Sequence, residues 1–324
     1  HLFKFYEANP NPFQRIGLNI KPYGEEDLVE EETESNSGAD TTDTLSKAEK
    51  AKLSFSHLHN HSQFSILQST SDINSLVKAA AANNMSGIAL TDTGNMMGAF
   101  HFVKAVNGHN KGVKERNEEQ ELKSELEKEI KPIVGCEFFV CNDHTDKSHK
   151  DNGALVVILA KNKNGYHNLA KLSSISNIDG FYYVPRIDKK LIEQYKEDLI
   201  ILSGGVRGEL ANLILNVGEK QAEEALIWWK EQFGDDFYIE LVRHGEEEEN
   251  HANTILIELA KKHQVKLVAA NNTFYIAQDQ AEAHDVLLCI RDGEKKSTPI
   301  GRGREYRFGM PNDEFYFKSQ AQMI

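Results

Sequence analysis

The sequence predicts an α/β fold in which a parallel sheet or barrel is covered by helices. Short apolar runs rich in Val, Ile and Leu recur along the chain, as strands buried on both faces require. Between the runs lie stretches with apolar residues at helical spacing, and this alternation is typical of parallel α/β sheets and barrels. The seven runs are residues 54–61, 86–92, 133–140, 154–160, 199–204, 237–242 and 266–271.

Helical stretches separate most of these runs. The stretch 71–84 opens with a serine and an aspartate, which suit a helix N-cap. Residues 226–233 include two tryptophans, of which we expect at least one to pack in the core. Residues 247–263 place apolar residues along one helical stripe. Residues 111–131 mix both charge signs at helical spacing, which predicts an exposed helical insertion.

The chain divides into four predicted regions. Residues 1–24 are expected to form an N-terminal arm or the remnant of an upstream region. Nine acidic residues fall between Glu25 and Asp43 with no basic ones, so residues 25–50 are predicted to be a disordered linker. Residues 51–290 form the predicted barrel domain, and 291–324 a C-terminal extension. The sequence begins with His1, and we expect a piece of a longer protein.

Composition excludes several classes of protein. No apolar stretch is long enough to span a bilayer, so no membrane association is expected. Three cysteines without metal-finger spacing fit reduced thiols in a cytoplasmic protein. The formal net charge of −13 argues against a broad DNA-binding face, because DNA is bound through Lys and Arg. The candidates for local nucleic-acid contact are Arg302, Arg304 and Arg307, with a solvated loop as the alternative.

The first apolar run, SFSHLHNH, ends in three histidines at alternating positions. In a strand, alternate side chains point to the same face, so His57, His59 and His61 are predicted to point one way. Imidazole is the commonest metal ligand in proteins. The run therefore predicts a metal site, with histidines satisfied by ordinary hydrogen bonds as the alternative.

Further polar residues follow the ends of later runs, where the reactive groups of α/β barrels gather. Together with the histidines they form the ligand inventory of a zinc or manganese site. The residues are His59, His61, Asp92, Glu137, His244, Asn271 and Asn272.

Eight blocks of the sequence, in this order and spacing, resemble one known family. The blocks are HLHNHSQFS, ALTDTGN, IKPIVGCEFF, ILAKNKNGYHNLAKL, GFYYVPRID, ILSGG, IELVRHG and AANNTFY. They are similar to PHP (polymerase and histidinol phosphatase) domains, and in particular to the branch found in bacterial DNA polymerase III alpha subunits. The resemblance runs from about Leu53 to the end. It implies a distorted seven-stranded, TIM-barrel-like (β/α)7 barrel and a role in DNA replication.

Active members of the family hold up to three metal ions at the barrel mouth and hydrolyse phosphoesters. The resemblance assigns four residues of this chain to ligand positions: His59, His61, Glu137 and His244. At five further positions the usual ligand is replaced. Asp is replaced by Gln68 and Asn272, and His by Thr93, Leu155 and Phe274.

These replacements predict a degenerate metal site. Leu and Phe cannot coordinate a metal, and an amide lacks the charge of a carboxylate. Only one carboxylate, Glu137, remains among the matched positions, so a cluster of dications would be poorly neutralised. We therefore expect no cofactor, or a single zinc or manganese ion on the four remaining ligands. Magnesium is expected only in the absent polymerase domain.

Three functions follow from the sequence. The first is a structural scaffold that supports the polymerase core of the same chain and docks other replisome subunits, such as a proofreading exonuclease. In this hypothesis the parent protein is a nucleotidyltransferase that contacts DNA, while the fragment is not catalytic. The alternative is an active metal-dependent phosphoesterase or 3′–5′ exonuclease. A metal-dependent amidohydrolase barrel is the third, and it is disfavoured because Asn272 stands where a carboxylate would be needed.

Overall fold

The computed structural model describes residues 53–119, 126–301 and 303–324. The predicted arm and acidic linker, residues 1–50, lie outside this part of the chain, so both remain predictions. Within the described part, no helix combines the length and the apolar character needed to cross a membrane.

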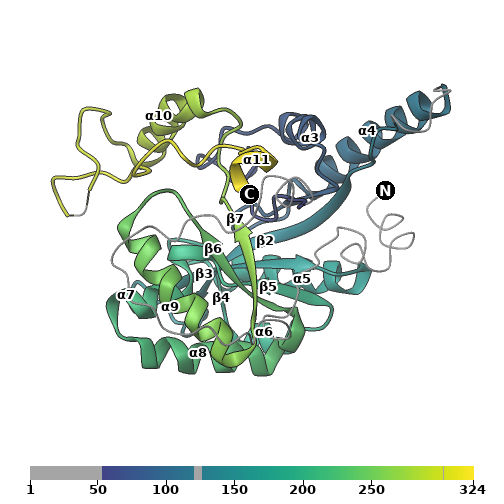
Figure 1. Ribbon diagram of the computed structural model, residues 1–324. Coiled ribbons are helices and arrows are strands. Elements are labelled where there is room, and N and C mark those ends of the chain that lie inside the picture. The colour runs from purple at the N-terminus through teal and green to yellow at the C-terminus, as the bar shows by residue number, and fades with distance from the viewer. Residues whose placement is uncertain (1–52, 120–125, 302) are drawn as a thin grey trace, which may run out of the picture.

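The centre of the protein is one curled mixed sheet (Figure 1). Its order is β1-β2-β3-β5-β6-β7, and β4 pairs with the C-terminal half of β2, next to β1. The strands are β1 (Gly87–Leu90), β2 (Lys131–Cys141), β3 (Ala154–Ala160), β4 (Arg186–Asp188), β5 (Leu199–Leu202), β6 (Phe237–Val242) and β7 (Lys266–Ala270).

The α/β class is confirmed, but the expectation of a parallel sheet is wrong in one respect. β3 runs antiparallel to both of its neighbours, β2 and β5, while the other pairs are parallel. Residues 142–153, which connect β2 to β3, contain no helix. Without a crossover helix the chain turns back on itself, and adjacent strands joined in this way pair antiparallel.

Six of the seven predicted runs form strands, and the first does not. Residues 57–61 instead connect the two edges of the sheet. On one side their carbonyls accept hydrogen bonds from the amides of Ala89 and Thr91, both at 2.9 Å. On the other side they exchange two backbone hydrogen bonds with Thr273, after β7, at 2.9 and 3.1 Å. The histidine segment is therefore fixed between β1 and the chain that follows β7.

Helices cover the sheet, with α6 to α9 below and beside it and α3, α10 and α11 above it in Figure 1. Asp72 caps α3 as predicted, accepting a hydrogen bond from the amide of Ser75. Trp229 of α8 is buried in the core. The helices are α3 (Ile73–Ala82), α4 (Ala99–Glu119), α5 (Lys163–Ile178), α6 (Lys189–Tyr195), α7 (Glu209–Asn216), α8 (Glu219–Phe233), α9 (Glu247–His263), α10 (Ala281–Asp292) and α11 (Gln320–Met323).

Apolar side chains fill the inside of the curled sheet. Because these apolar side chains occupy the interior, the polar side chains of the site lie toward one end of the sheet. This interior hydrophobic cluster consists of Leu58, Ala89, Ile133, Val157, Leu159, Ile200, Leu202 and Val268.

The end of the chain packs back against the site end of the sheet. The amide of Phe274 donates to the carbonyl of Phe315, and the amide of Phe317 to that of Tyr275, both at 2.9 Å. The side-chain amide of Asn271 donates to two further carbonyls of the same segment. Residues 312–318 thus run alongside 271–275 and cover the chain that follows β7.

Arg186 of β4 is fully buried, and no carboxylate pairs with it among the described residues. Its guanidinium donates four hydrogen bonds, to the backbone carbonyls of Gly180, Asp151, His144 and Asp146, at 2.9 to 3.2 Å. One side chain therefore holds the 142–153 loop against the loop that precedes β4.

Replacing Arg186 should destabilise the fold strongly. In Arg186→Met, four buried carbonyls lose their donor, and we expect the free energy of unfolding to fall by about 3 kcal/mol or more. Urea denaturation followed by circular dichroism measures this. Arg116→Met is the control, because that arginine is exposed and its one ion pair among the described residues is with Glu127. Equal effects of the two substitutions would contradict the assigned role.

Candidate metal centre

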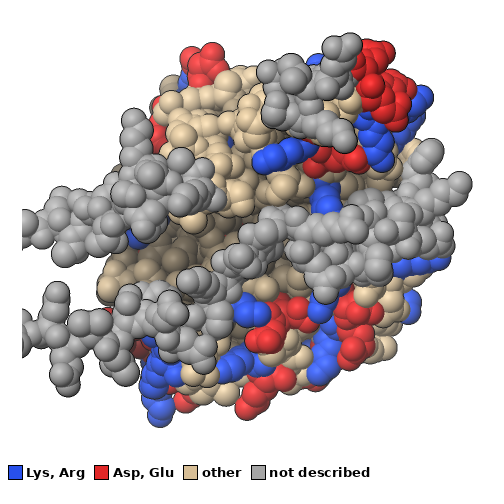
Figure 2. Space-filling model, turned by 45° about the vertical axis from the view of Figure 1, so that its right-hand side comes forward, with Lys and Arg blue, Asp and Glu red and all other residues tan. Residues whose placement is uncertain are grey.

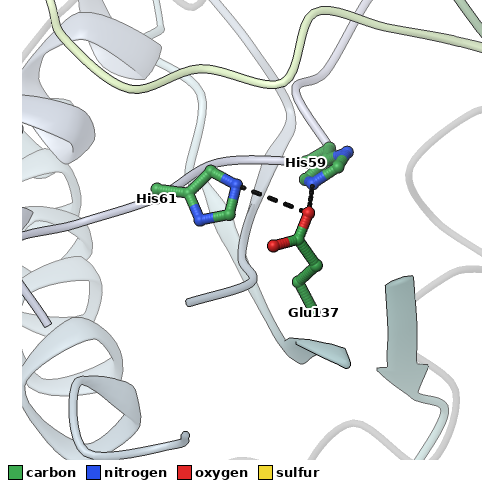
Figure 3. A group of neighbouring side chains, drawn as sticks. All are labelled: His59, His61 and Glu137. Atoms are coloured by element: carbon green, nitrogen blue, oxygen red, sulfur yellow. Dashed lines mark hydrogen bonds and ion pairs between the residues drawn. The ribbon is translucent and has the colours of Figure 1, made fainter. Parts of the chain in front are cut away.

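Three side chains meet at the end of the curled sheet: His59, His61 and Glu137 (Figure 3). Oε1 of Glu137 lies 3.2 Å from Nε2 of His59 and 4.0 Å from Nε2 of His61. All three residues are at most 2% exposed. Three of the four predicted ligands therefore form a group that could hold one metal ion.

A second carboxylate, Glu240, completes the surroundings of His59 and was not predicted. Nδ1 of His59 lies 2.7 Å from Oε1 of Glu240, on the far side of the ring from Glu137. A carboxylate on the second ring nitrogen is the usual support of a metal-binding histidine. The sequence held one signal for it, because Glu240 is the single charged residue in the apolar run FYIELV.

The electrostatics of this group favour a charged His59. Burial alone would lower the pKa of the imidazole, but Glu240 and Glu137 outweigh it and raise the pKa of His59 to about 10. Burial would raise the pKa of Glu137, yet the two facing histidines lower it to about 2. Burial lowers the pKa of His61 to about 4. The cluster therefore carries its own cation when no metal is present.

Three of the five replaced ligand positions surround this cluster. Thr93 donates a hydrogen bond from Oγ1 to Oε2 of Glu137 at 2.9 Å. Nε2 of His61 donates to Oδ1 of Asn272 at 2.9 Å. The ring of Phe274 stacks on His61, with centroids 4.2 Å apart. Hydrogen bonds and a stacked ring thus occupy the space where further ligands would be needed.

His244 does not join the cluster, although it matches a ligand position. Its Nδ1 lies 2.6 Å from a carboxylate oxygen of Glu249, in the first turn of α9. Its Nε2 lies 2.7 Å from the carbonyl oxygen of Asn271. Both ring nitrogens are therefore engaged elsewhere. Leu155 of β3 pairs with Phe139 of β2, and the carbonyl of Gln68 lies 2.7 Å from Nε2 of His284.

The expectation that all three histidines of the first run point one way is wrong. Nε2 of His57 lies 2.8 Å from the carbonyl oxygen of Lys318, and its ring packs against Phe55 and Phe317. The chain bends at His59, so the strict alternation of a strand is lost. His57 serves packing of the chain end and is not part of the candidate centre.

Asp92 accepts hydrogen bonds that stabilise the chain next to the cluster. Its Oδ1 accepts hydrogen bonds from the amide of Ser62 and the hydroxyl of Ser65, both at 2.7 Å. Its Oδ2 accepts a third from the hydroxyl of Ser62 at 2.8 Å. The carboxylate therefore fixes the turn that follows His61.

The donor set could hold one metal ion. Two imidazoles and one carboxylate lie within reach of a common point, and Glu240 orients His59. A second or third dication would have no further carboxylate among the matched positions. For one ion to bind, Nε2 of His59 and Nε2 of His61 would each have to release a proton, and His61 its hydrogen bond to Asn272.

The predicted nucleic-acid contacts separate in the structure. Arg304 is exposed, and Arg302 lies outside the described residues. Arg307 is buried, and its guanidinium pairs with both carboxylate oxygens of Asp285 at 2.6 and 2.8 Å. Contrary to the expectation, its side chain is not presented to a phosphate. In the view of Figure 2, Lys and Arg are interspersed with Asp and Glu and form no continuous basic face.

Comparison with known proteins decides the family. The model of the PHP domain matches residues 57–244, which include the candidate centre. The chain belongs to the PHP family. Its curated relatives include the DNA polymerase III subunit alpha of Borreliella burgdorferi, 38% identical over 83% of this chain and 22% of the relative. That of Treponema pallidum is 37% identical over 84% of this chain and 22% of the relative.

This PHP chain therefore spans about a fifth of the length of these relatives and corresponds to their N-terminal part. Among solved structures, an amidohydrolase from Chromobacterium violaceum is similar, with a TM-score of 0.43 and 11% identity. The match covers 68% of this chain and 87% of that chain.

Removing the charge of Glu240 should weaken the cluster without removing a ligand of the candidate centre. In Glu240→Gln, we expect the free energy of unfolding at neutral pH to fall by about 3 kcal/mol, because the buried His59 cation loses one partner. Chemical denaturation measures it. Glu223→Gln is the matched control, since Glu223 pairs with His263 nearer the surface. A smaller loss in Glu240→Gln than in the control would rule out a charged His59.

The pKa shifts also predict a pH optimum for the metal-free protein. The folded pKa of His59, about 10, lies above its ordinary 6.5, so its contribution is complete below pH 6.5 and is lost toward pH 10. The folded pKa of Glu137, about 2, lies below its ordinary 4.5, so its contribution is complete above pH 4.5 and is lost toward pH 2. Burial lowers the pKa of His57 and His61 from 6.5 to about 4, so their contributions are complete above pH 6.5 and are lost as the pH falls toward 4. Unfolding in a chelator should therefore be hardest near pH 6.5, and His59→Ala should flatten the alkaline side. Stability that grows between neutral and alkaline pH would refute the pairing.

Proposed function

We propose that this PHP domain is a non-catalytic structural and interaction module of a bacterial replicative DNA polymerase alpha subunit. The family assignment and the relatives named DNA polymerase III subunit alpha support the replication context. The main support for the non-catalytic role is that the His59, His61 and Glu137 cluster is buried and surrounded by side chains that cannot replace the usual ligands. In this proposal the domain supports the polymerase core of the same chain in the cytoplasm.

The geometry opposes hydrolysis in a specific way. A catalytic metal needs an open coordination position, where it lowers the pKa of a bound water that attacks the substrate. Here the group is buried, and Thr93, Asn272 and Phe274 fill the positions of missing ligands. In this proposal, burial and these three side chains keep a phosphoester away from an ion held by the cluster.

A single zinc or manganese ion remains compatible with the domain. His59, His61 and Glu137 would hold it, and a bound ion would supply a structural cross-link between the histidine segment and β2. Without the ion, the paired charges of His59, Glu137 and Glu240 stabilise the same arrangement. Magnesium belongs, in this proposal, to the polymerase domain alone.

A second function is an active metal-dependent phosphoesterase or 3′–5′ exonuclease. One observation favours it: Glu240 supports His59 through Nδ1, as in working metal sites. Docking of a proofreading exonuclease subunit or of other replisome subunits belongs to the first function, in which the barrel offers a surface and no chemistry.

Two measurements on the same preparation, of bound metal and of DNA hydrolysis, distinguish the two proposed functions. For the non-catalytic module we expect at most one equivalent of zinc or manganese per chain by elemental analysis. We also expect no release of nucleotides from the 3′ end of DNA with manganese, zinc or magnesium. Two or more bound ions, together with hydrolysis that His59→Ala abolishes, would establish the second function and refute the first.

A reversion variant provides the positive control. The combined substitution Thr93→His, Asn272→Asp and Phe274→His returns three family ligands to the cluster. We expect the number of bound ions per chain to rise above that of the parent, because a second carboxylate and two imidazoles then face the same space. Unchanged stoichiometry in a folded triple variant would show that these positions do not limit metal binding.

A further inference from the structure

Five large apolar side chains are exposed on α10 and on the loop that follows it. Ile290 of α10 is 65% exposed, and Phe308 at the end of the loop is 44% exposed. In Figure 1, α10 and this loop lie above the sheet, on the same side as the C-terminus. We name the group the terminal face, and its members are Val286, Ile290, Ile300, Tyr306 and Phe308.

The side chains of the terminal face are neighbours. Its two members on α10 are four residues apart and therefore lie on one side of the helix. The guanidinium of Arg291, in the last turn of α10, lies 5.0 Å from the ring centroid of Phe308. A Cβ on Gly309 would clash with the side chain of Ile300, which places Ile300 beside Phe308. Exposed apolar side chains that form a group mark an interaction site, whereas single ones are ordinary.

Polar contacts hold the loop in place. The buried guanidinium of Arg307 pairs with both carboxylate oxygens of Asp285 in α10 and donates from Nε to the carbonyl of Thr298 at 2.9 Å. The amide of Gly301 donates to the carbonyl of Arg307 at 3.1 Å, and the ring of Tyr306 lies against Gly301. These contacts fix the loop without burying the terminal face. A partner would therefore meet a surface that is already ordered, and little conformational entropy would be lost on packing.

Charge does not select the partner of this face. Residues 281–309 contain five acidic and six basic residues, a formal balance of one positive charge. Ion pairs within this segment join Arg291 to Asp292, Lys296 to Glu282 and Arg307 to Asp285. The face therefore offers apolar side chains among nearly balanced charges, which suits a polypeptide surface of the same character and not a polyanion.

The relatives contain a polypeptide that could cover the face. In the relatives named DNA polymerase III subunit alpha, the part matched by this chain is 22% of the length and is N-terminal. Most of each relative therefore follows the matched part. The match to the family model ends at residue 244, before α10 begins. The alignments to these relatives cover 83% and 84% of the chain and therefore continue past that residue.

We propose that the terminal face is the surface on which the following part of the same alpha subunit packs, so that apolar side chains of the polymerase core cover Ile290, Ile300 and Phe308. A contact between domains of one chain does not require the large apolar area of a permanent complex, because the linkage keeps the partner at high effective concentration. Exposed apolar side chains among charges fit a contact of this kind. The inference rests on the proposed function and adds to it the surface through which the domain supports the core.

Hydroxyl-radical labelling read by mass spectrometry tests the proposal on two proteins, the 324-residue chain and the full-length alpha subunit that contains it. We expect the labelling of Ile290, Tyr306 and Phe308 to fall several-fold in the full-length subunit. Phe181 and Tyr183 are the matched controls, because they are 52% and 62% exposed on the loop between α5 and β4, and their labelling should stay unchanged. Equal labelling of the terminal face in the two proteins would overturn the proposal.

The double variant Ile290→Glu with Phe308→Glu places two charges on the face. In the full-length subunit we expect the labelling of Tyr306 to return to its level in the 324-residue chain, because a buried carboxylate without a partner is unfavourable. The thermal midpoint of the 324-residue chain itself should stay unchanged, since both side chains are exposed there. The matched control Phe181→Glu should leave Tyr306 protected. Protection of Tyr306 that survives in the double variant would contradict the assigned contact.

Other occupants of the face give different results. Labelling that falls in the 324-residue chain alone as its concentration rises would show that a second copy covers the face, and would overturn the proposal. Protection of the full-length subunit that appears only after another replisome protein is added would overturn it too. Nucleotide release in the hydrolysis test would refute the non-catalytic role and leave the packing result standing. An unprotected face without nucleotide release would overturn the packing alone.

Discussion

The arrangement of the site end depends on one buried imidazole held between two carboxylates. His59 belongs to the segment that connects the edges of the sheet, Glu137 to β2 and Glu240 to β6. Burying a charge without a partner is costly. Here the cation lies between two carboxylates to which it donates hydrogen bonds, so the cation and both anions are stabilised. The cluster therefore links three separate parts of the curled sheet and its edges. A metal ion held by His59, His61 and Glu137 would link the histidine segment to β2 in the same way.

Glu240 makes the pocket more anionic than the sequence predicted. Matching positions to the family left one carboxylate, Glu137, and the deficit seemed to leave a weakly anionic pocket. Glu240 adds a second negative charge that no matched position revealed, since it stands inside an apolar run and was expected to be a strand residue only. The pocket is therefore anionic, but its charge is already met by His59. In the proposed function, the lack of additional ligands, rather than a lack of charge, limits the pocket to one ion.

The sequence predicted the elements better than their directions. Apolar runs located six strands and the capped helix α3, because burial and capping are local properties. It could not predict that β3 runs antiparallel, since that depends on a loop without a helix. β4 was missed because it has three residues and follows a proline. His57 and His244 matched the right residue type, but the direction of each ring is set by distant partners, Lys318 and Glu249.

The replaced ligand positions are not independent losses. Thr93 donates a hydrogen bond to Glu137, and Asn272 accepts one from His61. Phe274 stacks on the ring of His61. The chain end then packs over Phe274, because the carbonyl of Phe315 accepts its amide hydrogen bond. Each substitution therefore stabilises the metal-poor cluster that the others require.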